Sequence, residues 1–168
     1  SGQQGDKTVK NQHAHDQYGG GIIAMHRENN KLAAIIMLAT LNIDNLALIE
    51  SLEIDFSRRT NVVTGETGAG KSIIIGAVQL LLGQRADRSL VRAGADSCRI
   101  SAVIELGNNI TLLGEVNERL DQAGVTPCNE GQLIIARTIA AKGGKCFVNS
   151  TPVTLQLLAD LGAVLVDV

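Results

Sequence analysis

The sequence has few aromatic residues and almost no excess of charge. It contains two phenylalanines, one tyrosine and no tryptophan in 168 residues, although 45% of the residues are hydrophobic. We therefore expect a core of aliphatic side chains in a chain the size of one domain, or of part of a larger one. The formal net charge of −2 gives no overall attraction to nucleic acid or to a membrane, so any DNA contact would come from a local patch.

Cysteines and long apolar runs are also scarce. The three cysteines, Cys98, Cys128 and Cys146, are far apart and lack metal-ligand spacing. This pattern favours buried or partly buried thiols in a reducing cytosol over a metal site. No apolar run reaches the roughly 18 residues that a membrane-spanning helix requires. We therefore expect a cytoplasmic protein without a membrane partner.

The most informative stretch is residues 64–72, Thr-Gly-Glu-Thr-Gly-Ala-Gly-Lys-Ser, here called the phosphate loop. It fits the phosphate-binding pattern G-x-x-x-x-G-K-[ST]. Its glycines let backbone N–H groups approach phosphate oxygens. Lys71 is suited to neutralise the β- and γ-phosphates, and the Ser72 hydroxyl to coordinate Mg²⁺. The predicted nucleotide-binding residues are Gly65, Glu66, Thr67, Gly68, Ala69, Gly70, Lys71 and Ser72.

The sequence on both sides of the phosphate loop supports this interpretation. Residues 60–64 are β-branched or apolar, as expected of a buried strand that enters such a loop. Residues 73–82 are largely apolar and predict a helix that ends at Gly83, with its N-terminal dipole directed at the anion. A glycine-rich turn before an ordinary core helix is the alternative. The order of strand, loop and helix favours a nucleotide phosphate site.

The first 36 residues differ from the rest of the chain. They begin with a polar segment that contains a run of three glycines and the pair His13 and His15. Disorder, or sequence from a vector or an upstream region, explains this composition better than a metal site does. An organised pattern starts at Met37. We therefore expect an extension over residues 1–36 and a folded unit over residues 37–168.

Periodicity predicts the secondary structure of this unit. Alternating or continuous apolar runs indicate strands at residues 38–43, 52–56, 98–106, 132–140, 145–148 and 163–168. A turn is expected at Asp44 and Asn45, so that an antiparallel β unit precedes the phosphate loop. An apolar stripe predicts a helix over residues 110–122 that ends at Gly124. A second helix is expected over residues 155–161, with Thr154 as its N-cap and Gly162 as its end.

Three arginines follow the predicted phosphate-loop helix within residues 84–95. They are Arg85, Arg88 and Arg92. One interpretation is a solvated connection between a helix and a strand. The other is a positive edge that reaches phosphates, a partner subunit or DNA. The sequence leaves both interpretations open.

Taken together, these residues resemble the RecN family of bacterial double-strand-break repair ATPases, which is related to the SMC proteins. The resemblance rests on residues 37–49 and 52–56, on the phosphate loop, and on the hairpin from residue 136 to residue 153. It covers nearly all of residues 37–168. It implies an α/β P-loop NTPase fold of the ABC/SMC head type, here its N-terminal lobe, with an antiparallel β unit and a mixed αβ core.

The resemblance also implies partners. In that family a coiled coil follows, and a C-terminal lobe supplies the signature motif, the Walker B aspartate and the catalytic glutamate. ATP and Mg²⁺ are then held between two heads. The implied partners are ATP, the C-terminal head lobe of the same protein, a second head in a homodimer and, in the full-length context, DNA in the nucleoid. Likeness to SMC heads marks Arg85 as a contact to nucleotide or DNA. This chain by itself should bind nucleotide better than it hydrolyses it.

Two other hypotheses come from the residues themselves. Residues 164–167 match a Walker B strand, in which Asp167 would hold Mg²⁺ through water. The chain would then be a self-sufficient small P-loop NTPase or kinase, although a GTPase is disfavoured because the Asn/Thr-Lys-x-Asp motif is absent. The family resemblance instead places Asp167 on the strand before a glutamine-containing loop. A third hypothesis is a non-catalytic interaction module whose phosphate loop is only structural.

Overall fold

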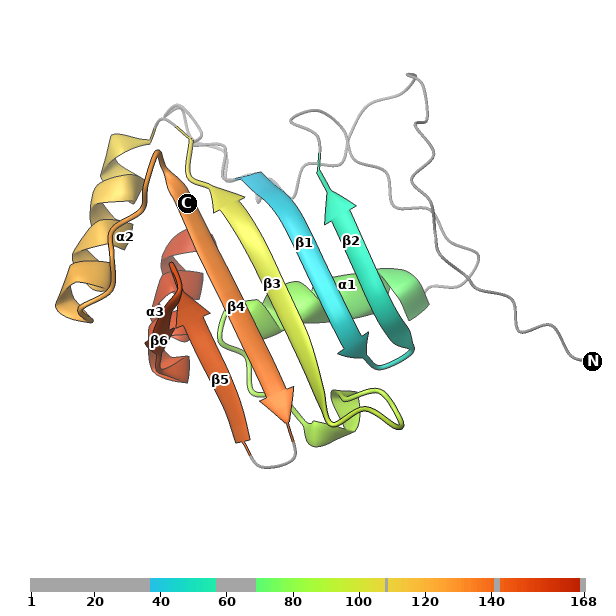
Figure 1. The fold of residues 1–168 in the computed structure, drawn as a ribbon. Helices are drawn as coiled ribbons and strands as arrows, with labels where there is room; N and C mark the ends of the chain where they lie inside the picture. The colour runs from blue at the N-terminus through green and yellow to red at the C-terminus, as the bar shows by residue number, and fades with distance from the viewer. Residues whose placement is uncertain (1–36, 57–68, 108, 141–142, 167–168) are drawn as a thin grey trace, which may run out of the picture.

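The computed structural model describes residues 37–56, 69–107, 109–140 and 143–166. In these ranges the chain forms one six-stranded antiparallel sheet in the order β2-β1-β3-β4-β5-β6 (Figure 1). The strands are β1 (Met37–Leu46), β2 (Ile49–Asp55), β3 (Ser97–Glu105), β4 (Gln132–Ala140), β5 (Gly143–Val148) and β6 (Thr151–Val153). The helices are α1 (Ala69–Leu81), α2 (Ile110–Gln122) and α3 (Leu155–Val166), with a short 3₁₀ helix, η1 (Arg88–Leu90).

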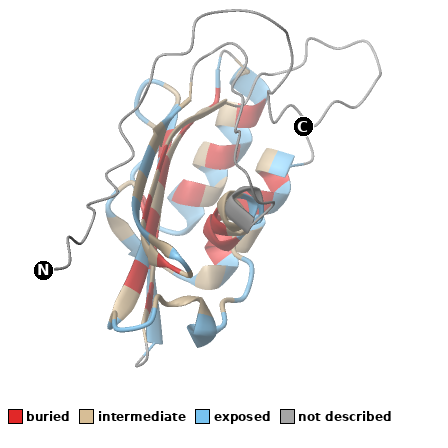
Figure 2. Ribbon diagram, turned by 90° about the vertical axis from the view of Figure 1, so that its right-hand side faces the viewer, coloured by how far each residue is buried: buried red, intermediate tan, exposed pale blue. Residues whose placement is uncertain are grey.

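The helices lie on one side of the sheet, so within the described residues they cover one of its two faces (Figure 2). The strands alternate accordingly, because successive side chains point to opposite faces. Leu41 pairs with Ala102, and Ala102 pairs in turn with Ile135. All three side chains are at most 2% exposed. None of the buried core residues in the described part of the chain is aromatic, which confirms the expected aliphatic core.

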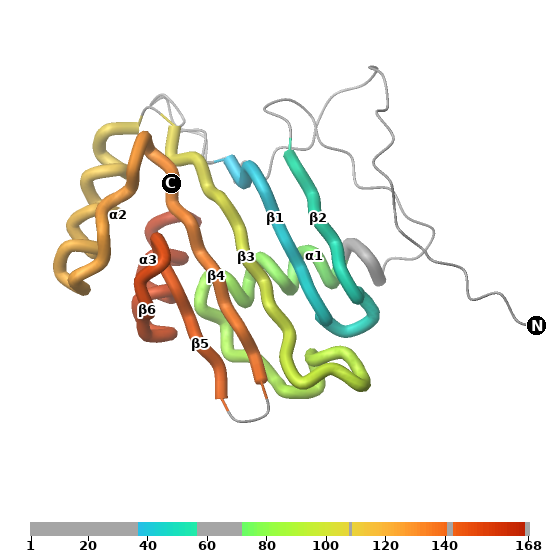
Figure 3. Tube along the Cα trace, viewed as in Figure 1, coloured from blue at the N-terminus to red at the C-terminus, as the bar shows by residue number. Residues whose placement is uncertain are grey.

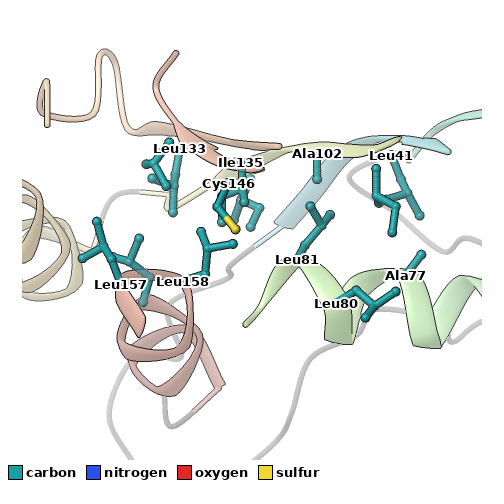
Figure 4. Packing of buried hydrophobic residues seen from close by; sticks show 14 of the residues in the cluster. Leu41, Ala77, Leu80, Leu81, Ala102, Leu133, Ile135, Cys146, Leu157 and Leu158 are labelled. Atoms are coloured by element: carbon teal, nitrogen blue, oxygen red, sulfur yellow. The ribbon is translucent and has the colours of Figure 1, made fainter. Parts of the chain in front are cut away.

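Helix α1 packs on the covered face of the sheet through its C-terminal half. Ala77 and Leu81 point toward the strands (Figure 4), and Leu80 is buried beside them. Their i, i+3, i+4 spacing puts the three on one side of the helix. Burial of a leucine side chain contributes roughly 1.5–3 kcal/mol. The helix ends as expected at Gly83, where φ is +89°.

Helix α3 corrects two expectations at the end of the chain. Thr154 is the predicted cap, since its Oγ1 accepts the N–H of Leu157 at 3.2 Å. Gly162, however, does not end the helix, and residues 163–166 are helical rather than a strand. Residues 157, 158, 161, 162 and 164 are buried, which is the spacing of one helix face. A short apolar run alone does not distinguish a strand from a buried helix.

The turn between β1 and β2 is also displaced from its expected position. It lies at Ala47 and Leu48, not at Asp44 and Asn45, because β1 continues to Leu46. Leu46 is 3% exposed and forms a β-bridge with Val91, in the connection between α1 and β3. Burial of the side chain and this bridge together keep residues 44–46 in the strand. The Asp44 carboxylate instead accepts a cross-strand hydrogen bond from the Ser51 hydroxyl at 3.0 Å.

The remaining elements follow the sequence pattern closely. Helix α2 begins after Asn109, whose side chain accepts the N–H of Leu112 at 3.1 Å, and the chain leaves the helix at Gly124 with φ +67°. Strands β3 and β4 lie within one residue of their predicted bounds, β5 begins two residues earlier than predicted, at Gly143, and the short strand β6 was not predicted. Residues 1–36 and the expected strand at 60–64 lie outside the described residues.

The cysteines are free thiols, as expected. Cys98 and Cys146 are buried and Cys128 is half-buried. Burial raises the pKa of all three thiols above the usual value, because an apolar environment disfavours the thiolate. Within the described ranges, no helix is both long enough and apolar enough to span a membrane.

Candidate functional site

The described part of the phosphate loop is the start of helix α1. The helix begins at Ala69, so the glycine, lysine and serine that close the motif fall in its first turn. Residues 64–68 lie outside the described residues, and the side chains of residues 69–71 are not described either. The predicted helix is therefore present, and it begins four residues after Gly65.

The N-terminal end of α1 is suited to an anion. The first N–H groups of a helix have no partner within the helix and carry the positive end of its dipole. No acidic residue lies in the first turn of α1, so no carboxylate there would repel a phosphate. Ser72 is exposed, as a residue that coordinates a metal beside a nucleotide would need to be. The first turn of α1 is therefore suited to an anion such as a phosphate group.

The opposite end of α1 is held by a residue that the sequence analysis missed. Arg137 lies on an inward position of β4 and is only 6% exposed. Its Nη1 donates to the carbonyl oxygens of Leu80 at 2.6 Å and of Gln84 at 2.5 Å. Burial lowers the pKa of its guanidinium, because desolvation disfavours the charged form. The only sign of this role in the sequence is that an arginine occupies an inward position of a strand whose residues alternate between apolar and polar.

The three arginines after α1 do not act as one group. Arg92 forms an ion pair with Glu50 at 3.2 Å, with 40% and 77% of the two side chains exposed. The backbone N–H of Arg92 also donates to the carbonyl oxygen of Asn45 at 2.9 Å. This bond attaches the connection between α1 and β3 to the end of β1, next to the β1–β2 turn. An exposed pair of this kind contributes at most about 1 kcal/mol. Arg92 thus has a structural role, whereas Arg88 on η1 stays exposed.

Arg85 lies beyond the C-terminal end of α1. Figure 3 shows α1 crossing the strands, with its C-terminal end toward β4, and the carbonyl of the preceding residue, Gln84, bonds to Arg137 on that strand. At about 1.5 Å per residue, a helix of this length separates its two ends by about 20 Å. The structure therefore brings Lys71 and Ser72 together in one turn and leaves the exposed Arg85 at the other end of the helix.

The Walker B hypothesis for the end of the chain loses the strand on which it depends. Residues 164–166 belong to α3, and Val164 packs into the core at 8% exposure. Asp167 itself lies outside the described residues. A Walker B acid follows a buried strand, so the observed helix does not provide its usual setting.

Sequence comparison assigns the chain to a family. Residues 40–144 match the AAA domain family. The DNA repair protein RecN of Vibrio cholerae is 43% identical over 136 residues, which are 79% of this chain and 23% of that protein. RecN of Haemophilus influenzae is 38% identical over 133 residues, which are 79% of this chain and 23% of that protein. The chain thus spans about a quarter of the length of these curated relatives.

Solved structures show the same fold at low sequence identity. The Smc head domain of Pyrococcus furiosus, with an extended coiled coil and bound to the C-terminal domain of ScpA, has a TM-score of 0.59 at 18% identity, covering 77% of this chain and 33% of that one. The recombination mediator protein RecF has a TM-score of 0.56 at 15% identity, covering 73% of this chain and 29% of that one. The expected fold class is thereby confirmed: the chain belongs to the AAA domain family, with a RecN-like sequence and the fold of SMC and RecF ATPase heads.

Proposed function

We propose that this chain is the ATP-binding N-terminal lobe of a DNA-repair ATPase. The observation that carries the proposal is that α1 starts inside the phosphate loop, so that the lysine and serine of the motif share its first turn. The repair context comes from the RecN relatives, which are DNA repair proteins. The nucleotide context comes from the motif and from the ATPase-head fold.

Each residue of the phosphate loop has a proposed role. Backbone N–H groups from Gly65 to Gly70 cradle the phosphates, with Glu66, Thr67, Gly68 and Ala69 between them. The Lys71 ammonium neutralises the β- and γ-phosphates, and the Ser72 hydroxyl coordinates Mg²⁺. Bound Mg²⁺ supplies charge neutralisation on the phosphate oxygens. These groups bind and orient the nucleotide, which is most of what phosphoryl transfer asks of a protein.

Hydrolysis requires groups from outside this lobe in the proposed mechanism. A water-positioning residue and a second source of positive charge complete a phosphoryl-transfer site. We propose that the C-terminal lobe of the same protein and a second head of a homodimer provide them, and that DNA acts on the assembled protein in the nucleoid. The chain spans only 23% of its RecN relative from Vibrio cholerae, which leaves room for these parts.

The proposal is tested by measuring ATP–Mg²⁺ binding to this chain by calorimetry, with phosphate release assayed on the same sample. We expect saturable binding that depends on Mg²⁺, and no turnover above the buffer rate. Turnover that Lys71→Ala abolishes would contradict the half-site proposal and favour a self-sufficient NTPase. Absence of binding at millimolar ATP would contradict the nucleotide assignment itself.

We further propose that Arg85 contacts DNA or the partner head in the assembled protein. It is exposed and lies about 20 Å, one helix length, from the first turn of its own α1. In the full-length protein, Arg85→Ala should lower DNA-stimulated ATP turnover by about tenfold, the value of one charged hydrogen bond. Arg99→Ala is the matched control, because Arg99 is also exposed but lies on β3. Unchanged turnover in Arg85→Ala would remove this role.

A further inference from the structure

A buried arginine stands out in the aliphatic core. Arg137 pairs across the sheet with Ile100 on β3 and with Cys146 on β5. The groups that act on its guanidinium are the thiols of Cys146 and Cys98, which burial keeps protonated and neutral, and no carboxylate among the described residues does so. A buried cation is costly unless hydrogen bonds compensate it. The partner of Arg137 must therefore be sought in the backbone.

That partner is the C-terminal end of α1. The last carbonyl groups of a helix have no N–H partner within it and carry the negative end of the dipole. The two carbonyl oxygens that accept from Arg137 Nη1 belong to Leu80, in the last turn, and to Gln84, just beyond it. A charged donor makes stronger hydrogen bonds than a neutral one. Arg137 thus attaches the end of α1 to the β4–β5 hairpin.

The described apolar contacts of α1 run along the helix but are most complete in its C-terminal half. Its buried side chains, Ala77, Leu80 and Leu81, all lie in the C-terminal half. In the half nearer the phosphate loop, Ile73 and Ile74 are partly buried against the core, while Ser72 and Ile75 are exposed. Apolar contacts are not directional, whereas the two hydrogen bonds of Arg137 are. Arg137 therefore adds a directional contact at the C-terminal end of the helix.

We propose that Arg137 is a positioning residue for the nucleotide site. Because α1 is a stiff rod about 20 Å long, a tilt of about 3° at one end moves the other end by about 1 Å. A displacement of that size matters where several groups must meet the phosphates together. By fixing the end of α1, Arg137 places Lys71 and Ser72, and it makes the β4–β5 hairpin part of the support of the site. This role rests on the proposed binding of ATP.

The test separates positioning from stability by comparing three variants of this chain. Arg137→Met keeps an apolar side chain of similar length but cannot donate to the two carbonyl groups. Arg137→Lys keeps the charge but lacks the guanidinium fork. Ile139→Ala is the matched control, because Ile139 is the next inward residue of β4 and is 5% exposed. Its truncation lowers stability without touching α1's carbonyl groups.

We expect Arg137→Met to raise the calorimetric Kd for ATP–Mg²⁺ by about tenfold, which corresponds to about 1.4 kcal/mol. Arg137→Lys should raise the Kd less. Ile139→Ala should lower the unfolding midpoint and leave the Kd unchanged. Hydrogen exchange should be faster in the α1 peptide of Arg137→Met than in that of Ile139→Ala, with or without nucleotide.

Chemical rescue adds a readout that a purely structural role would not show. A cavity of about 700 Å³ is lined by Arg137 together with Gly144, Lys145, Thr154 and Leu155, so a small cation can reach the position of the guanidinium. Millimolar methylguanidinium should restore ATP affinity to Arg137→Ala and leave Ile139→Ala unaffected.

Two outcomes would overturn the proposal, and they can be told apart. If the unaltered chain binds ATP and Arg137→Met binds it equally well, Arg137 serves stability alone and the proposed function stands. If the unaltered chain does not bind ATP, the nucleotide assignment fails and the positioning role fails with it. The hydrogen-exchange comparison then reports only whether Arg137 holds α1 in place.

Discussion

Replacement of Lys71 by alanine should weaken ATP–Mg²⁺ binding at least a hundredfold. The lysine ammonium is the one cationic side chain that the motif brings to the β- and γ-phosphates. A hydrogen bond to a charged group contributes about 1.5–3 kcal/mol, and contacts to two phosphates together exceed the roughly 2.7 kcal/mol that a hundredfold change in Kd requires. Calorimetric titration of the variant against the unaltered chain, with thermal melts of both, measures the effect at equal folded fraction.

Lys145→Ala is the matched control for this variant. Lys145 is exposed on β5, and its removal changes the net charge by the same amount. If Lys71→Ala and Lys145→Ala lose affinity for ATP–Mg²⁺ equally, general electrostatic attraction explains the binding. The phosphate loop would then have no specific part in it. If Lys71→Ala binds ATP as well as the unaltered chain, the loop is only structural, as the interaction-module hypothesis holds. In the full-length protein, Lys71→Ala should also lose nucleotide-dependent dimerisation.

The strands could be predicted from the sequence because one face of the sheet is covered. Residues such as Leu41 and Ile43, or Ile100 and Ala102, are buried with polar neighbours between them, and this period of two is visible without a structure. The helix that begins at the end of the motif could be predicted for a similar reason. A glycine-rich motif, a lysine and a serine next to each other contain the chemistry of a phosphate site in one local segment.

The failures involve contacts between residues distant in the sequence. Residues 163–166 are apolar and suit a strand or a buried helix equally well, and they continue a helix whose Val164 is buried in the core. Gly162 of α3 lies so close to Leu82 that an added Cβ would be 2.7 Å from its carbonyl oxygen. Arg137 was missed for the same reason, because the carbonyl of Leu80 to which it bonds is 57 residues away. No local pattern contains such a pairing.

The contact between α1 and α3 leads to the largest expected change in stability. Gly83 ends α1 with φ +89°, and a Cβ added there would lie 2.4 Å from the backbone nitrogen of Ala159 and 2.6 Å from its Cα. Gly83→Ala therefore incurs two penalties. The left-handed backbone costs an L-residue about 1–2 kcal/mol, and overlap with the α3 backbone adds about 1–3 kcal/mol. We expect the free energy of unfolding to fall by about 3 kcal/mol or more in denaturant titrations.

Gly94→Ala is the control that separates the two penalties. Gly94 has φ +87°, nearly the value at Gly83, but a Cβ there would meet nothing within 4 Å. Its substitution should lower the free energy of unfolding by only about 1–2 kcal/mol, the backbone penalty alone. The difference between the two variants then measures the contact of α3 with the end of α1.

The contact between α1 and α3 can also be tested by substitutions in α3. Here the test is whether the substitution raises or lowers the free energy of unfolding. Alanine is favoured over glycine inside a helix by up to about 1 kcal/mol, so Gly114→Ala in α2, with open space around it, should stabilise the chain. Gly162→Ala should destabilise it, because its Cβ would press on the Leu82 carbonyl. Stabilisation by both substitutions, with equal losses at Gly83 and Gly94, would mean that α3 does not lie against α1. Residues 163–166 would then lose the packing that makes them a helix, and the Walker B strand that ends at Asp167 would regain its basis.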